Sequence, residues 1–203
     1  QTVKITRGQF SDNDSSLGLQ IYSLGTVTLS SVQADGNIGN GAWIDTCIYN
    51  GGWDRCDGSG GLTITGSGNS FSGNEGYGLY VLSRNSVALS NVIVDDNKWT
   101  GVSITHTYSN STGTITLSST SGTINSISDN DYYGMYILSH GAISLANFNA
   151  NNNLNYGAFI SNDGSATPKD VTVSNASIKN NQNTGLHIYS QGIITLSGVE
   201  VVD

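Results

Sequence analysis

Carboxylates gather in the short polar turns of this chain, often beside an asparagine. Oxygen-rich turns of this kind can hold a weakly bound Ca²⁺ where several of them converge. A solvated acidic edge is the alternative, and it is favoured because the acids occupy different positions relative to the asparagine and no EF-hand-like spacing is present. No other cofactor is indicated. The acids are Asp12, Asp14, Asp35, Glu75, Asp95, Asp96, Asp129 and Asp131.

Histidine is the most common general base and metal ligand, yet its spacing here suggests neither role. His106, His140 and His187 lie at different offsets from the glycines that punctuate the chain, so they are not expected to align. No Ser-His-Asp arrangement and no paired acid and base can be assembled from the spacing. The sequence therefore predicts no catalytic residue and no metal site.

Aromatic residues are the remaining candidates, because they recur at fixed distances from glycine. Contiguous exposed rings usually bind sugars through their faces or contact another protein. Edge packing against neighbouring loops is the alternative interpretation. Two positions after a glycine stand Trp43, Tyr80, Tyr136 and Phe159, and directly before a glycine stand Tyr77, Tyr133 and Tyr156.

The two cysteines, Cys47 and Cys56, bracket the segment "IYNGGWDR". This spacing is too long for a CxxC redox pair, and the further ligands of a zinc site are missing. A local disulfide is favoured over two reduced thiols. A disulfide indicates an oxidising compartment, and therefore an extracellular or cell-surface protein.

Charge and composition exclude several classes of function. The 203 residues carry a net charge of −8 with seven basic side chains, which leaves no electrostatic footprint for nucleic acid or an anionic membrane. No apolar run is long enough for membrane insertion. With 26 Gly, one Pro and 11% charged residues, the chain favours β-structure and tight turns over helices.

A repeated structural unit must position the candidate residues, because the segments "SGNEGYGLYVLS" and "SDNDYYGMYILS" are copies of one sequence repeat. Each unit has an apolar-x-apolar anchor strand, a third short strand before an asparagine turn, and then a glycine followed by another alternating strand. Loops of different length separate the units. The anchor pairs are Val3/Ile5, Val27/Leu29, Leu62/Ile64, Val87/Leu89, Ile115/Leu117, Ile143/Leu145, Val171/Val173 and Ile194/Leu196.

Asparagine recurs at one register of this unit. An amide side chain there can bond both the amide of the next coil and the bent backbone, which would build a ladder along the stack. A general preference of asparagine for turns is the alternative, but so many in one register favour the ladder. Asn162 lies outside the register and is expected to be exposed. The ladder residues are Asn13, Asn37, Asn74, Asn97, Asn130, Asn153 and Asn181.

The recurring N-x-x-x-G-[LMAV]-x-[IV] pattern, as in "NDYYGMYI" and "NQNTGLHI", resembles the right-handed parallel β-helix superfamily, and in particular the repeat-rich β-helices of large bacterial surface proteins. The resemblance covers essentially the whole chain. It implies an all-β solenoid, and the eight anchor pairs predict about eight coils with three short strands each. Residues 1–203 are expected to be a single segment of a longer solenoid or of a fibre of stacked copies. Coils about 4.8 Å apart would place Tyr80 and Tyr136 about 9.6 Å apart, with Trp43 and Phe159 on the intervening coils.

The resemblance leaves the function open, since the superfamily includes lyases, hydrolases, adhesins and passive stalks. Inert outward strand positions favour an extracellular structural or adhesive segment of a bacterial surface protein or filament over a polysaccharide-binding or polysaccharide-degrading β-helix. An ice-binding solenoid is less favoured, because Ala88, Ala142, Ala146 and Asp170 interrupt its threonine arrays. The expected partners are glycans, or other copies stacked end to end on uncapped strand edges. No nucleic acid and no membrane insertion are expected.

Overall fold

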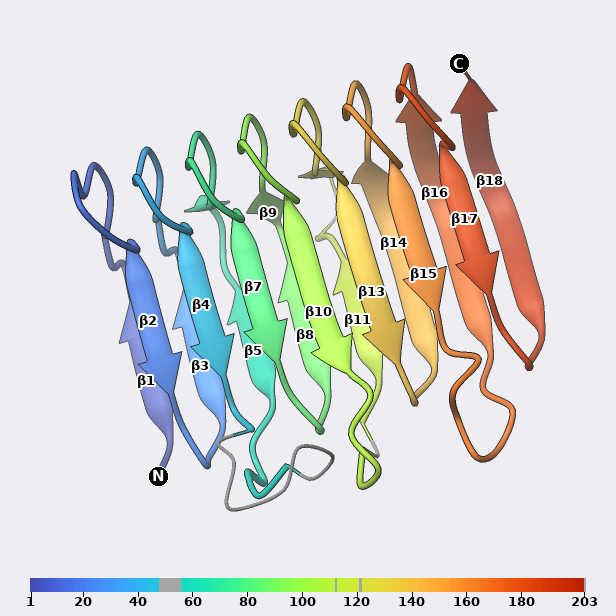
Figure 1. Cartoon of the computed structure of the whole chain (residues 1–203), viewed down its shortest axis with the longest axis horizontal. Helices are drawn as coiled ribbons and strands as arrows, with labels where there is room; N and C mark the ends of the chain where they lie inside the picture. The colour runs from blue at the N-terminus through green and yellow to red at the C-terminus, as the bar shows by residue number, and fades with distance from the viewer. Residues whose placement is uncertain (48–55, 112, 121, 203) are drawn as a thin grey trace.

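The computed structural model describes residues 1–47, 56–111, 113–120 and 122–202, and they wind into a parallel β-solenoid (Figure 1). The described residues form no helix, and thus none with the length and apolarity needed to cross a membrane. The expected fold is confirmed. Its front sheet in Figure 1 has seven strands, so the chain completes seven turns and adds an eighth anchor strand instead of forming eight full coils.

The predicted anchor strands lie side by side in one sheet, here called the anchor sheet, at the register expected from the sequence. Alternate residues point into the core, which is why these segments read apolar-x-apolar. The strands are β1 (Val3–Thr6), β3 (Val27–Ser30), β5 (Leu62–Thr65), β8 (Val87–Ser90), β11 (Ile115–Ser118), β14 (Ile143–Asn149), β16 (Val171–Lys179) and β18 (Ile194–Val202).

The strands that follow the glycines form the second sheet, here called the front sheet, which packs against the anchor sheet across the core (Figure 1). The chain runs through one anchor strand, one polar turn and one front strand in each coil. The front strands are β2 (Leu19–Tyr22), β4 (Ala42–Asp45), β7 (Leu79–Leu82), β10 (Val102–His106), β13 (Met135–Ser139), β15 (Ala158–Ser161) and β17 (Leu186–Tyr189).

The predicted third strand is separate only in the middle of the solenoid, as β6 (Asn69–Ser70), β9 (Val92–Ile93) and β12 (Asn125–Ser126). From β14 onward the third strand is continuous with the anchor strand, in β14, β16 and β18, so three separate strands per coil is not a general rule. The physical reason is a bend without a break: Asn147 and Asn175 take the left-handed conformation, with φ of 57° and 49°, inside a strand that stays paired.

The core between the two sheets is aliphatic and narrow. The inward residues of the central coils, such as Leu62, Ile64, Leu79 and Val81, have no exposed surface. Larger side chains occur where the coil turns, as with the fully buried Phe71. Burying such residues on both sheets supplies the main stabilisation of the stack.

The asparagine ladder is confirmed. Each amide Nδ2 donates to the Oδ1 of the ladder asparagine in the next coil at 2.6–3.0 Å, from Asn13 through Asn181. The same Oδ1 accepts the backbone N–H of the preceding ladder residue at 2.9–3.1 Å. Because the amides also donate to carbonyls of the preceding coil, as Asn97 does to Phe71, the buried polar groups of this turn are satisfied.

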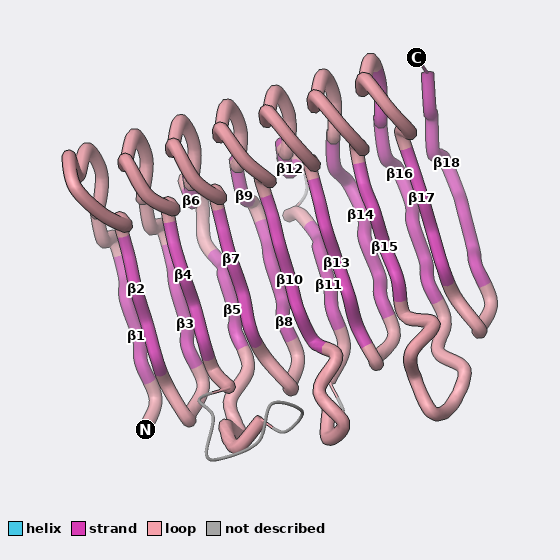
Figure 2. The backbone as a smooth tube through the Cα atoms, viewed as in Figure 1, coloured by secondary structure: helices cyan, strands magenta, loops and turns pink. Residues whose placement is uncertain are grey.

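The glycine four residues after the ladder asparagine is required by the next coil. A Cβ atom on Gly101 would lie 2.7 Å from Nδ2 of Asn130, and one on Gly78 would lie 2.7 Å from Nδ2 of Asn97. The N-x-x-x-G spacing therefore records a contact between neighbouring coils. Figure 2 shows the uniform turns that result along the upper edge of the solenoid.

The opposite, lower edge in Figure 2 carries loops of uneven length after the front strands. A second column of mostly polar residues, here called the lower polar column, runs along this edge, five residues after the glycine that precedes each front strand. It includes Thr46, whose hydroxyl donates to Ser83 at 2.9 Å. Asn162 belongs to this column. The expectation that Asn162 is exposed is wrong, because its side chain is buried and donates to the carbonyls of Gly141 and Lys169. The column is Ser23, Thr46, Ser83, His106, Ser139, Asn162 and Ser190.

The predicted disulfide between Cys47 and Cys56 is present, with Cα atoms 4.7 Å apart. Both cysteines are buried in a small cluster with Tyr108 and Leu82, separate from the main core. Asn110 Nδ2 also donates to the Cys56 carbonyl at 2.8 Å. The bridged segment 48–55 lies outside the described residues.

Candidate functional site

The outer face of the front sheet carries a column of rings. The strand register pairs Trp43 with Tyr80, and Tyr136 with Phe159. The two pairs are separated by β10, which contributes Ser103 to the same column. Trp43 and Phe159 thus flank Tyr80 and Tyr136, and the expectation that they lie on the intervening coils is wrong because only one coil separates the two tyrosines.

The rings pack into two groups, one on each side of Ser103. In the first aromatic cluster, Tyr80 contacts Trp43 and Tyr77 with ring centroids 5.1 Å apart. In the second, Tyr136 stacks on Phe159 at 5.1 Å and 17°. The first cluster is Tyr22, Trp43, Tyr77, Tyr80 and Trp99. The second cluster is Tyr132, Tyr133, Tyr136, Tyr156, Phe159, His187 and Tyr189.

A groove of about 320 Å³, here called the aromatic groove, separates the two clusters. Ser103 and Thr105 of β10 form its floor together with Thr100. The floor is set back because Ser103 is small, and only 4% of that residue is exposed. The walls are Tyr77 and Tyr80 on one side and Tyr132, Tyr133 and Tyr136 on the other.

The described residues that line the aromatic groove carry no charge, because they supply phenol rings and hydroxyl groups. Burial raises the pKa of Tyr77, and the neighbouring phenols of Tyr132 and Tyr136 raise it further. Burial and a hydrogen bond with Tyr132 raise the pKa of Tyr133 to about 12. The phenols of Tyr77 and Tyr133 therefore stay protonated at neutral pH and can both donate and accept hydrogen bonds.

All seven sequence-predicted aromatic residues lie on this face, but sequence reasoning missed several partners. Trp99 and Tyr132 stand two residues before a glycine, and Tyr22 and Tyr189 stand four residues after one. Their fixed offsets were a usable signal. The groove itself was not predicted, because in the sequence Ser103 is only one of several small outward-facing residues. Its importance depends on the rings of the neighbouring coils, which only the structure brings beside it.

A family model described as a right-handed beta helix region matches residues 55–203. The chain belongs to the right-handed β-helix family. No curated protein and no solved structure gives a significant match. Family membership accounts for the fold of this β-helix. It does not establish an activity, since proteins of one fold have many different functions that depend on their individual sites.

Five of the acids in the polar turns of the β-helix have structural roles. Asp12, Asp96 and Asp129 directly precede ladder asparagines and take the left-handed conformation, with φ of 58–59°. Asp35 and Asp95 instead accept the backbone N–H of Ser72 and Ser128 in the next coil, both at 2.7 Å. Among the described residues, no three His, Cys, Asp or Glu side chains converge as metal ligands would.

The histidines fall into three different environments. His187 belongs to the second aromatic cluster. His106 is fully buried in the lower polar column, where Nε2 donates to the Arg84 carbonyl at 2.7 Å and Nδ1 lies 3.0 Å from the Ser139 hydroxyl. Burial, together with the nearby His140, lowers the pKa of His106 to about 4 against the opposing effect of the Arg84 carbonyl.

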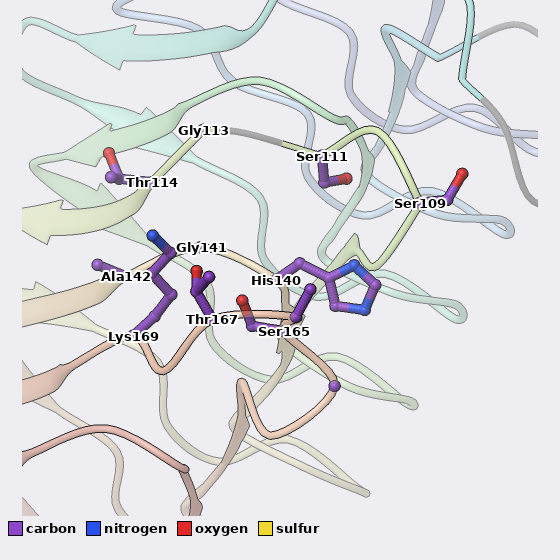
Figure 3. A pocket seen from close by; sticks show the side chains of 12 residues that line it. Ser109, Ser111, Gly113, Thr114, His140, Gly141, Ala142, Ser165, Thr167 and Lys169 are labelled. Atoms are coloured by element: carbon purple, nitrogen blue, oxygen red, sulfur yellow. The ribbon is translucent and has the colours of Figure 1, made fainter.

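His140 lines a second hollow of the β-helix, here called the loop cavity, with a volume of about 590 Å³ (Figure 3). The loops after β10 and β15 enclose it and supply hydroxyl groups, among them Ser109 and Ser165. In the part of the chain that the structure describes, the lining includes Lys169 and no carboxylate. Nδ1 of His140 lies 3.1 Å from the Tyr108 carbonyl, so that nitrogen is already engaged.

Proposed function

We propose that this β-helix is an extracellular adhesive segment that binds neutral glycans through the outer face of its front sheet, without cleaving them. The aromatic groove between the two aromatic clusters is the observation that carries the proposal. Sugars bind proteins through apolar ring faces together with a few hydroxyl contacts, and this face offers both kinds of group.

The strands give the rings the rigidity that such binding needs. Trp43, Tyr80, Tyr136 and Phe159 stand on paired front strands, and ring contacts of 5.1 Å hold them against one another. Side chains held in this way lose little conformational entropy when a ligand binds. All four are half-buried, so part of each ring remains open to solvent.

Two further observations support an adhesive, non-catalytic role outside the cell. Among the described residues, the lining of the aromatic groove offers no carboxylate, imidazole or amine that could act as a general acid or base. The Cys47–Cys56 disulfide is typical of proteins in oxidising compartments.

The test is retention on an array of neutral glycans. Tyr80→Ala with Tyr136→Ala should abolish retention while the melting temperature stays close to that of the wild type, because both rings lie outside the core. Tyr80→Phe with Tyr136→Phe is the matched control: it keeps the ring faces and should retain most of the binding. An earlier melting transition in the alanine variant, combined with no binding by the wild type, would mean that the rings only pack against each other.

A polysaccharide-degrading enzyme is the second candidate, and the loop cavity is what favours it. His140 and Lys169 are titratable groups in a concave site of ordinary ligand-binding size. Turnover of neutral and acidic polysaccharides, measured with and without Ca²⁺, tests this candidate. Activity that His140→Ala removes would replace the adhesive proposal.

A further inference from the structure

The ring column of the front sheet is interrupted at one interior position. The strands β4, β7, β13, β15 and β17 each place an aromatic or imidazole ring there. These rings are Trp43, Tyr80, Tyr136, Phe159 and His187. The strand β10, between Tyr80 and Tyr136, places Ser103 there instead. The aromatic groove exists because this one side chain is small.

The width of the interruption matches one saturated ring. Strands β7 and β13 both pair with β10, so they lie about 9.6 Å apart, twice the usual strand spacing. Carbon atoms in contact are separated by about 3.5–4.0 Å, so a ring touching both walls needs about 7–8 Å. The groove therefore has room for one ring between its walls and not for two stacked rings.

One wall presents a ring face. Phe159 stacks on Tyr136 at an interplanar angle of 17° from the side away from β10, so the opposite face of Tyr136 is turned toward the groove. Tyr80 contacts Trp43 edge to face, at 73°, and forms the other wall with Tyr77. A ring inserted here would stack on Tyr136 and pack against the tyrosines of the first aromatic cluster.

The floor can bind the polar edge of such a ring. No hydrogen bond to the Ser103 hydroxyl is formed by any part of the chain that the structure describes, and that hydroxyl lies at the bottom of the groove. Thr105 and the protonated phenols of Tyr77 and Tyr133 stand around it. Hydroxyls of this kind pair equally well as donors and acceptors with the hydroxyls of a neutral sugar.

We infer that the aromatic groove takes a single pyranose unit of a neutral glycan, inserted edge-on between Tyr80 and Tyr136 with its hydroxyl edge on Ser103. The inference rests on the proposed glycan-binding function and adds to it the mode of binding and the residue that permits it. Ser103 is then the specificity-determining residue of this face, because it creates the space.

Filling the groove tests the inference. Ser103→Phe makes the ring column continuous and closes the slot, whereas Gln20→Phe adds a ring to the same column at its far end on β2 and leaves the slot open. The probes are neutral hexasaccharides of β-1,4-linked glucose and of β-1,4-linked mannose, with affinity measured by calorimetry. Insertion predicts that Ser103→Phe weakens the binding of the better probe at least about tenfold and that Gln20→Phe leaves it unchanged.

The other outcomes separate this inference from the proposal beneath it. Equal or tighter binding by Ser103→Phe would overturn insertion and leave a glycan lying flat on a continuous stripe. A wild type that binds neither these probes nor any glycan of the array would overturn the proposed function together with the inference. Ser103→Val, with a smaller side chain, carries the same comparison if Ser103→Phe lowers the melting temperature, and a graded loss from Val to Phe is then expected.

Discussion

Among single residues, one type of side chain has different structural roles at different positions of the coil. Asp96 allows a left-handed turn, while Asp95, its neighbour, accepts a backbone N–H of the next coil at 2.7 Å. Burial raises the pKa of Asp95, and the hydrogen bond from Ser128 opposes that rise. Residue type alone therefore says little here, because the position within the coil decides whether a polar group is buried and which partner it meets.

His106 makes the stability depend on pH. Its pKa is about 4 in the folded protein, against an ordinary value of about 6.5 when unfolded. As the pH falls below about 6.5, His106 is protonated in the unfolded state but stays neutral in the folded state. The free energy of unfolding therefore decreases until about pH 4, where the folded state is protonated as well. Between pH 7 and pH 5 we expect this residue to account for a loss of about 2 kcal/mol in the free energy of unfolding.

Denaturant unfolding of the wild type and of His106→Ser at both pH values measures this loss. Serine is the matched replacement, because it stands at the same position of the lower column in Ser83 and Ser139. The wild type should lose more stability than the variant on going to pH 5. An equal loss in the two proteins would show that His106 is not the source of the pH dependence.

At the scale of elements, the stack is held by columns that cross from coil to coil. Each central ladder asparagine has an amide partner on both sides, as Asn97 has Asn74 and Asn130. Glycines such as Gly101 keep the space for the amide of the next coil. A coil is stable only when it is stacked between other coils, because an isolated coil would leave its amides and carbonyls without hydrogen-bond partners.

The ladder predicts a gradient of sensitivity along the solenoid. Asn130→Leu should lower the free energy of unfolding by about 1–3 kcal/mol, because it leaves buried backbone and amide groups unpaired on both sides. Asn13→Leu should have a smaller effect, since Asn13 is exposed and bonds a ladder residue on one side. Urea midpoints are the measurement, with the exposed Asn183→Leu as control. Equal midpoints for the Asn130 and Asn183 variants would argue against the ladder as a stabilising element.

At the scale of the whole molecule, the solenoid has two unlike outer faces. The front sheet presents the two aromatic clusters, while the outward column of the anchor sheet is mostly threonine and serine, interrupted by Ala88. The loops that carry the disulfide and the loop cavity leave from the lower edge, opposite the ladder turns (Figure 1). The core and the ladder are thus independent of the loops.

This independence predicts that the disulfide is dispensable for the fold. Cys47→Ser with Cys56→Ser should leave the circular dichroism spectrum unchanged and lower stability by less than about 3 kcal/mol, because the closed loop is short. For contrast, Phe148→Ala, in the fully buried main core, should cost about 3–5 kcal/mol. Loss of the β-sheet signal in the serine variant would mean that the loop cluster is needed to hold the coils together.

The sequence by itself determined the coil, because a repeated local pattern has one common solution: the anchor pairs, the asparagine register and the glycine after it all predicted the observed strands and ladder. The cysteine pair was likewise close enough in the chain to be predicted as a local bridge. The aromatic groove depended on tertiary structure, since Tyr80, Ser103 and Tyr136 become neighbours only when three coils stack in register. The loop cavity depended on it too, because irregular loops follow no period, and their partners are set by whichever coils lie beside them. Asn162 does follow a period, five residues after a glycine, but only the stacked coils show that this column is buried.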